Sequence, residues 1–269
     1  MKKILYLTDL YYQAKGRNYY EEDIFLSGIL KDHFDIVLCN PKNSSSFEND
    51  VDLIIFRKTG SVLNFKEGYD SFRERVKINN LKTFNDFTGK ADMCGKQYLV
   101  DLTLEDYPVI PTIDDIKNID LLPNSDLFVI KPKDGADSIG IEFLTKEELI
   151  KKDLNKNILI QPAIDFEYEL SFYFINDKFE YALYAPNKEE RWKLERYVPS
   201  IEEIGFAKRF IEWNTIENGI QRVDACKTKD GQLLLVELED LNPYLSLLEL
   251  NEETVEIFIN DLVDAIKNL

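Results

Sequence analysis

The chain has 269 residues, of which 44% are hydrophobic and 31% are charged, so it is long enough to bury one large or several small cores. Its formal net charge of −17 argues against binding nucleic acid or an anionic membrane surface, because both select basic proteins. No apolar run approaches a membrane span, and the scattered cysteines and single histidine fit neither a disulfide framework nor a multi-histidine metal site. We therefore expect a cytoplasmic protein.

Buried strands alternate with a helix in the first third of the chain. Short apolar runs at residues 3–9 ("KILYLTD"), 35–39 ("DIVLC") and 51–57 ("VDLIIFR") are typical of buried strands. Residues 19–34 carry apolar side chains at helical spacing. This order predicts a small parallel α/β domain that ends near residue 80.

The remaining two thirds combine strands with capped helices. Thr145 and Ser200 each precede a glutamate at the spacing of a capping box, which marks a helix start. A last amphipathic helix is predicted at about residues 251–266. Strands are predicted at 127–132 ("LFVIKP"), 139–144 ("IGIEFL") and 157–162 ("NILIQP"), followed by a hairpin over 167–185 with its turn at Asn176-Asp177.

A glycine-containing loop follows the strand that ends in "VIKP". Gly135 and Gly140 would let the backbone approach a ligand closely, and successive N–H groups of such a loop can surround phosphate oxygens. Lys131 and Lys133 add positive charge. The loop is not a Walker A motif, because Ile141 and the next residue stand where Lys and Ser or Thr are required. A structural glycine hairpin is the alternative interpretation.

A second unusual stretch is the hairpin of residues 219–243, which places charged residues inside its strands. If Asp230-Gly231 forms the turn, Asp224 lies opposite Glu237 and Arg222 opposite Glu239, all on one face; a three-residue loop would break this register. Opposed carboxylates repel, so a positive group should lie between them. Arg222 and a divalent cation are the two candidates; the alternative is a solvated face balanced by one salt bridge.

A phosphate-binding loop followed by paired carboxylates is what a nucleotide–Mg²⁺ site needs. The motifs resemble those of the ATP-grasp superfamily of carboxylate–amine ligases, which includes glutathione synthetase and D-alanine–D-alanine ligase. The most specific part is "RVDA…LLLVELEDLNP", and the order of motifs is similar to the branch that contains the ligase of D-cycloserine biosynthesis. The resemblance implies an α/β (α+β) fold: an N-terminal pre-ATP-grasp domain (1–84), a central subdomain with the glycine loop (85–164) and a C-terminal subdomain with the metal site (165–269), the last two clasping the nucleotide.

The resemblance also implies roles for individual residues. Arg222 would be catalytic, and Asp224, Glu237 and Glu239 would bind Mg²⁺ or Mn²⁺, with Asn242 as an alternative metal ligand or a substrate contact. The implied ATP-binding residues are Lys96, Lys131, Lys133, Gly135 and Ser138 for the phosphates, Gln161, Pro162, Ala163 and Ile164 for adenine, and Glu169 for the ribose.

The implied activity is ATP-dependent activation of a small-molecule or amino-acid carboxylate as an acyl phosphate, followed by attack of an amine. Arg57, at the end of a predicted strand, and Arg191 and Arg196, in a polar stretch, are candidate contacts for the carboxylate or acyl phosphate. Two alternatives remain open: a small-molecule kinase of the same fold, and a nucleotide-binding regulator without turnover. Small-molecule substrates are the expected partners, and a homodimer is left open.

Overall fold

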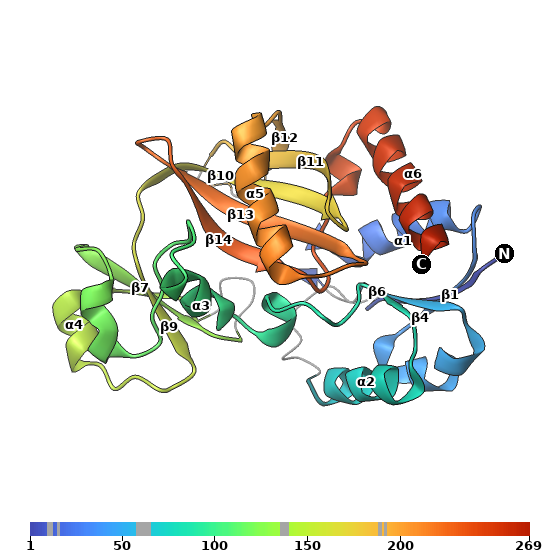
Figure 1. Ribbon diagram of the computed structural model, residues 1–269, viewed down its shortest axis with the longest axis horizontal. Helices are drawn as coiled ribbons and strands as arrows, with labels where there is room; N and C mark the ends of the chain where they lie inside the picture. Colours follow the sequence, from blue (N-terminus) through green and yellow to red (C-terminus); the bar gives the residue numbers. More distant parts are fainter. Residues whose placement is uncertain (10–12, 15–16, 58–65, 135–139, 188–189, 191–192) are drawn as a thin grey trace.

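The described part of the protein, taken from a computed structural model, is organised around three sheets of three or more strands (Figure 1). It covers residues 1–269 except 10–12, 15–16, 58–65, 135–139, 188–189 and 191–192. The helices are α1 (Tyr20–Leu30), α2 (Lys66–Asn79), α3 (Tyr98–Leu104), α4 (Lys146–Lys151), α5 (Ile201–Asn214) and α6 (Glu252–Asn268). The strands are β1 (Lys3–Leu7), β2 (Gln13–Ala14), β3 (Arg17–Asn18), β4 (Asp35–Cys39), β5 (Leu53–Phe56), β6 (Thr83–Phe84), β7 (Leu127–Pro132), β8 (Glu142–Thr145), β9 (Ile158–Pro162), β10 (Phe166–Ile175), β11 (Lys178–Ala185), β12 (Glu195–Tyr197), β13 (Ile220–Thr228) and β14 (Leu233–Glu239).

The N-terminal sheet is wholly parallel, with the strand order β4-β1-β5-β6. β5 is buried at every position, as expected of a parallel strand that helices cover on both faces. α2 covers one face, where Tyr69 and Phe72 pack against Phe56. The predicted parallel sheet is confirmed. α2 is not among the predicted helices, because only those two of its residues are buried.

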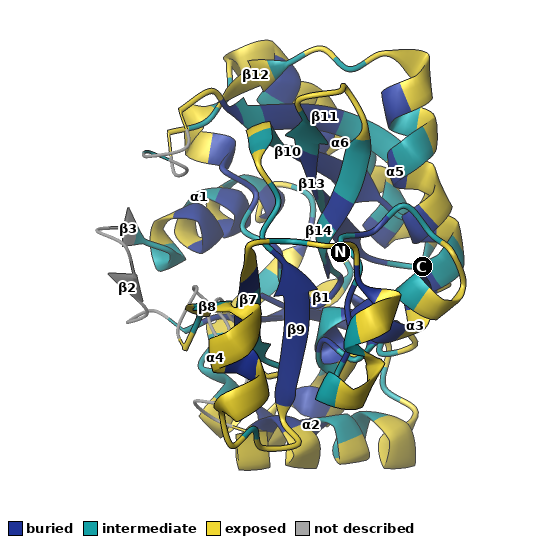
Figure 2. Cartoon of the chain, turned by 90° about the vertical axis from the view of Figure 1, so that its left-hand side faces the viewer, coloured by how far each residue is buried: buried dark blue, intermediate teal, exposed yellow. Residues whose placement is uncertain are grey.

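The small central sheet, β8-β7-β9, is antiparallel. Ile130 of β7 points into an apolar cluster that contains Leu149 of α4. Because side chains alternate along a strand, its neighbour Lys131 lies on the opposite face of β7. β9 is buried along its whole length (Figure 2), since it pairs with β7 on one side and with Ile113 on the other.

The C-terminal sheet has five antiparallel strands in the order β12-β11-β10-β13-β14. α5 covers one face of it (Figure 1), in a cluster that includes Val223 and Leu238. The predicted hairpin of β10 and β11 is confirmed, and Asn176 at its turn has a φ of 56°, in the left-handed region that asparagine tolerates. The other face of this sheet carries the charged residues of β13 and β14 and, beside them, Tyr173 and Ile175 in the apolar cluster that includes α6.

Both predicted capping boxes are present at helix N-termini. Thr145 and Glu148 exchange hydrogen bonds at the start of α4, and Ser200 and Glu203 do so at the start of α5. Each box satisfies backbone N–H groups that have no partner within the helix, which explains why these helices begin where the sequence predicts. None of the helices in the described ranges is long and apolar enough to cross a bilayer.

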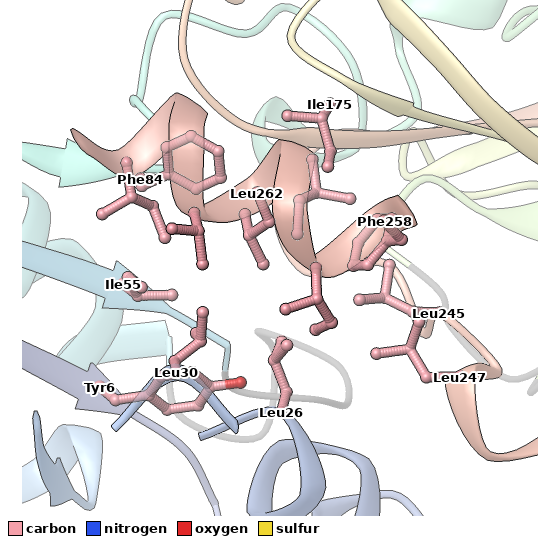
Figure 3. Close-up of a cluster of buried hydrophobic side chains, with 14 of the residues drawn as sticks. Tyr6, Leu26, Leu30, Ile55, Phe84, Ile175, Leu245, Leu247, Phe258 and Leu262 are labelled. Carbon is pink, nitrogen blue, oxygen red and sulfur yellow. The ribbon is translucent and has the colours of Figure 1, made fainter. Parts of the chain in front are cut away.

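α6 joins the first and last thirds of the chain in one hydrophobic core (Figure 3). Phe258 and Leu262 of α6 pack in a cluster with Tyr6 and Ile55 of the N-terminal sheet and Ile175 of β10. Burying five such side chains on folding, at roughly 1.5–3 kcal/mol each, contributes on the order of 10 kcal/mol of hydrophobic stabilisation. The three main sheets fall within the three predicted domain ranges, but α6 packs on the first domain as well as the last, so those boundaries stay a prediction.

Glu180 of β11 is a buried carboxyl beneath α6. Its side chain is 1% exposed, and its Oε1 lies 3.9 Å from the ammonium nitrogen of Lys178. Burial and the nearby Asp261 carboxylate raise the pKa of Glu180 from its usual 4.5 to about 8. A carboxyl group with a raised pKa stabilises the folded state most fully below pH 4.5, and this contribution is lost as the pH rises through about 8.

Glu180→Gln removes this ionisation, so its free energy of unfolding should fall less between about pH 5 and about pH 9 than that of the parent. Near pH 9 we expect the variant to be more stable than the parent by more than about 1 kcal/mol. Urea unfolding at both pH values measures the difference. Glu256→Gln, an exposed position on α6, is the control and should follow the parent. The same pH dependence for Glu180→Gln and the parent would contradict a raised pKa.

Candidate functional site

The hairpin of β13 and β14 carries charged side chains on one face of the C-terminal sheet. Arg222 lies opposite Glu239, and Asp224 lies opposite Glu237, as the sequence predicts. Between them, Val223 faces α5. The alternation of side chains thus separates an apolar face from a charged face within the same strands.

The turn that produces this register differs from the predicted one. Thr228 and Gln232 close a loop of three residues, in which Gly231 has a φ of +86°. A three-residue loop alone would displace the opposed residues by one, as expected from the sequence. A bulge between Asp224 and Ala225 adds an unpaired residue to β14 and restores the pairing. The predicted two-residue loop is therefore wrong, whereas the predicted opposition is confirmed.

The strands beside β13 and β14 share this face, on which Leu183 of β11 and Tyr173 of β10 are apolar and buried. Cross-strand partners share a face. One row therefore runs through Arg196 of β12, Leu183 of β11, Ser171 of β10, Asp224 of β13 and Glu237 of β14. The Ser171 hydroxyl donates to Asp224 at 2.6 Å, which orients that carboxylate. Ser171 was not a predicted site residue, since a serine in an alternating strand gives no distinct signal.

Asp224, Glu237 and Glu239 form what we call the acid trio. Each offers a carboxylate oxygen within 4.8 Å of the other two, and all three residues are half-buried. Mg²⁺ takes oxygen ligands, usually one or two carboxylates together with phosphate oxygens. The donor set therefore fits Mg²⁺ or Mn²⁺.

Arg222 links two members of the acid trio. Its Nε and Nη2 donate to Asp224 at 2.9 and 2.7 Å, and Nη2 also donates to Glu239 at 2.6 Å. Its Nη1 donates to the carbonyl of Tyr244 at 2.9 Å. Burial lowers the pKa of Arg222, but the two carboxylates outweigh it and hold that pKa well above its usual value. Burial raises the pKa of Glu239 to about 7, against the opposing effect of Arg222.

Lys96 reaches the third member of the trio from the central part of the chain. Its ammonium group donates to Glu237 and, at 3.0 Å, to Asp92. The side chain is 8% exposed, so the ammonium group is largely removed from water. Asp92 was missed as a site residue, although its spacing from Lys96 is one at which helical charges meet.

Buried hydrogen bonds fix the segment that carries Asp92 and Lys96. Asp240, directly after the trio, accepts from the backbone N–H groups of Ala91 and Met93 at 3.0 and 2.8 Å. The N–H group of Leu238 donates to the hydroxyl of Tyr98 at 2.8 Å. The segment is therefore bound to β14 on both sides of Lys96, and Lys96 lies beside the acids as a consequence.

Lys131 and Lys133 approach from β7. Burial, with a smaller contribution from the charge of Lys96, lowers the pKa of Lys131 to about 7. Lys133 already has partners: it donates to Gln97 and, at 2.8 Å, to Asp114. Lys133, which directly follows β7, is thus already engaged by side chains of the protein.

Solved structures share this arrangement of sheets. D-cycloserine synthetase DcsG matches with a TM-score of 0.74 and 17% identity, over 97% of this chain and 99% of that chain. D-alanine–D-alanine ligase from Bacillus anthracis, complexed with ATP, matches with a TM-score of 0.69 and 15% identity over 100% and 97% of the two chains. The ATP-grasp ligase PsnB, complexed with a precursor variant, Mg and ADP, has a TM-score of 0.62, 12% identity and coverage of 97% and 96%.

The chain has the ATP-grasp fold. The fold expected from the sequence motifs is confirmed. No family model matches the sequence, and no curated protein matches it either. At these identities the comparisons establish the fold, and the roles of individual residues depend on the geometry of this chain.

Within the ATP-grasp fold, the segment expected to contact adenine is β9 and the residues after it. The side chain of Gln161 is buried and donates to Thr112 at 2.8 Å. Pro162 pairs with β7, and the N–H group of Ala163 donates to the carbonyl of Leu127 at 2.9 Å. These contacts fix the backbone of the segment. Adenine binding there stays a prediction.

Two further predicted nucleotide residues in this region are half-buried. Ile164 follows the β9 segment, and Glu169 is paired with Cys226 in the C-terminal sheet. Glu169 stands two positions before Ser171 in β10, so it shares the face of the acid trio. Its predicted contact with the ribose is compatible with that face and stays a prediction.

Arg57 is bound within the protein rather than presented to a substrate. It is 2% exposed and donates to Glu22 at 3.2 Å, to Asp23 at 3.3 Å and to the carbonyl of Pro243 at 2.8 Å. Burial raises the pKa of Glu22 to about 7. Each nitrogen that carries an N–H group has a protein acceptor, so the predicted contact between Arg57 and a substrate carboxylate is not supported by its surroundings.

The other predicted substrate residues are placed differently. Arg196 is exposed on the edge strand β12, at the end of the row that leads to the acid trio. Asn242 is half-buried after the trio, and its Nδ2 is buried without a hydrogen-bond partner in the described structure. Arg191, Gly135 and Ser138 lie outside the described residues.

Arg222 should contribute to stability because it neutralises two carboxylates. Arg222→Met leaves Asp224 and Glu239 without this partner, so we expect a loss of about 2–3 kcal/mol in the free energy of unfolding at neutral pH. The expected loss is smaller than the loss on breaking a fully buried ion pair, because the side chains of Arg222, Asp224 and Glu239 are 15–25% exposed. Urea unfolding measures it.

Arg196→Met is the matched control, since it removes an exposed arginine from the same face of the sheet. Its effect should stay within about 0.5 kcal/mol. An Arg222→Met variant as stable as the parent would mean that the acids do not depend on this arginine for compensation.

Proposed function

We propose that the protein is an ATP-dependent ligase that activates a carboxylate as an acyl phosphate and joins it to an amine. The observation that carries this proposal is the acid trio, paired with Arg222 and Lys96, on the inner face of an ATP-grasp fold. The fold is shared with a ligase complexed with ATP and with one complexed with Mg and ADP. Both support ATP and a divalent cation as the ligands of this site.

The acid trio would hold Mg²⁺ or Mn²⁺, which neutralises phosphate charge when bound. Lys96 and Lys131 would bind the phosphate oxygens of ATP. Arg222 is adjacent to the trio and permanently charged, so it can stabilise negative charge on the group in transfer. Positioning and charge neutralisation account for most catalysis of phosphoryl transfer, so the chain needs no nucleophilic side chain.

In the proposed reaction an oxygen of the substrate carboxylate attacks the γ-phosphorus of ATP, and ADP leaves. The nitrogen of the amine then attacks the acyl carbon, the bond to the phosphate oxygen breaks, and phosphate and a proton are released as the amide forms. The kinase alternative would transfer the same phosphoryl group to a hydroxyl and release no free phosphate. The regulator alternative would bind ATP without either product.

Product analysis separates these three functions. A ligase should release ADP and phosphate in equal amounts, and only when a carboxylate and an amine are supplied together; amino acids and small acids are the first compounds to screen. Glu237→Gln should lower kcat by at least about 100-fold, because a metal-binding carboxylate is lost. ADP formation with a phosphorylated alcohol would favour the kinase, and binding without turnover the regulator.

Thermal unfolding tests the binding of nucleotide and metal directly. Mg²⁺·ATP should raise the Tm of the parent by mass action. Lys131→Ala should weaken ATP binding by at least about tenfold, close to 1.4 kcal/mol, and reduce the increase in Tm accordingly. Lys152→Ala is the matched control, because Lys152 lies in the same subdomain and pairs with Glu142 near the surface. A full increase in Tm for Lys131→Ala would remove Lys131 from the proposed phosphate site.

A further inference from the structure

Lys96 and Glu237 form an ion pair that two ligands would disrupt: a divalent cation would compete for Glu237, and a nucleotide phosphate would compete for Lys96. Its ammonium group donates to Glu237, which is also a member of the acid trio that fits a divalent cation. The remaining two acids, Asp224 and Glu239, are held by Arg222 instead. Lys96 is therefore the cation paired with the one acid of the trio that Arg222 does not hold.

We infer that Lys96 is the counter-ion of the metal site in the nucleotide-free protein and couples metal binding to nucleotide binding. Nucleotide phosphates draw the ammonium group away from Glu237, and Glu237 is then free to bind the metal. This inference rests on the proposed function of the site. It adds that Lys96 weakens the binding of the metal alone, whereas metal and nucleotide strengthen each other's binding when both are present.

The chain provides for such an exchange of partners. Asp92 accepts from Lys96 at 3.0 Å, so the ammonium group keeps one anionic partner when it leaves Glu237. The backbone N–H group of Lys96 donates to the carbonyl of Lys133 at 2.9 Å, and Tyr98 is bound to β14. Because the backbone is held on both sides, only the side chain of Lys96 has to move. Asp92 is thus a positioning residue that keeps Lys96 beside the site in both states.

Electrostatics gives the direction of the effect. Like charges at close separation in a partly buried site repel by several kcal/mol. A divalent cation that binds without nucleotide must displace or tolerate the Lys96 ammonium, so its affinity is reduced. A phosphate group removes this penalty because it supplies the negative charge that Lys96 loses. By linkage, the metal must raise nucleotide affinity by the same factor.

The first experiment measures the binding of Mn²⁺ alone, from the electron paramagnetic resonance signal of the free ion. Lys96→Met should bind Mn²⁺ at least about tenfold more tightly than the parent in the absence of nucleotide. Lys90→Met is the matched control: it removes the same charge from the same segment, but Lys90 donates to the carbonyl of Trp213, away from the acids. Equal or weaker binding of Mn²⁺ by Lys96→Met, relative to Lys90→Met, would overturn the inference.

The second experiment changes Glu237, the partner of Lys96, and so does not depend on the folding of a Lys96 variant. In Glu237→Gln, Lys96 is no longer held by a carboxylate of the trio, so metal-free ADP in EDTA should bind more tightly than to the parent. Glu239→Gln removes the same charge from an acid that Arg222 holds, and is the control. Calorimetry should show a gain of at least about threefold for Glu237→Gln over Glu239→Gln. Equal affinities would contradict the coupling through Lys96.

Failure of the proposed function gives a different result. If the parent binds neither Mn²⁺·ADP nor Mg²⁺·ATP, the site is not a nucleotide site and the inference falls with it. If the parent binds Mn²⁺·ADP but Lys96→Met shows no gain in affinity for Mn²⁺ alone, the nucleotide site stands and the counter-ion role of Lys96 is wrong.

Discussion

Three carboxylates lie close together on one face of the C-terminal sheet, and positive side chains must neutralise them. The arrangement of the site depends on this requirement. Asp224, Glu237 and Glu239 would repel one another within 4.8 Å if no positive group lay between them. One compensating charge, Arg222, comes from the same hairpin, whereas Lys96 comes from the segment before α3. The acids of the C-terminal sheet are therefore compensated in part by a residue of the central part of the chain. The ion pair between Lys96 and Glu237 both balances charge and holds these two parts of the chain together.

Buried hydrogen bonds, as well as apolar contacts, hold together the chain segments around this site. Asn85 donates from Nδ2 to the carbonyls of Ile220, in β13, and of Asp240, which directly follows β14. Glu22 accepts from the N–H groups of Leu245 and Leu247, in the segment that follows them. A polar group left buried between these segments without a hydrogen-bond partner would be destabilising by about 1–3 kcal/mol. Each of these hydrogen bonds therefore favours one relative position of the two segments that it joins. Apolar packing alone would tolerate small displacements that a metal site does not.

The sequence predicts this fold well where local patterns and motifs coincide. Capping residues and alternating strands follow from local chemistry, and they are confirmed. The opposed pairs Arg222–Glu239 and Asp224–Glu237 are also confirmed, although a three-residue loop and a bulge produce them rather than the predicted turn. The bulge in β14 could not be predicted, because it depends on how the strand fits its neighbours. The burial of Arg57 depends on contacts between distant segments, which a residue's own surroundings in the sequence do not reveal. Asp92 lies four residues before Lys96, so its spacing offered a local signal for that contact. α2 was missed because its buried stripe is narrow.

Overall charge and local charge act on different scales in this protein. A net charge of −17 excludes a broad basic surface, yet the binding of an anionic nucleotide depends on a few cations within a Debye length of about 10 Å. Lys96 is largely removed from bulk water and Lys131 is half-buried. Screening is weaker at such positions than in bulk water, so each charge acts more strongly on its neighbours. In the proposed site the acids beside them would not cancel this effect, because the same carboxylates would bind the metal that accompanies a nucleotide. On the proposed function, a net acidic chain would hold a triphosphate through a few cations that are partly or wholly removed from water, with its acids turned toward a metal.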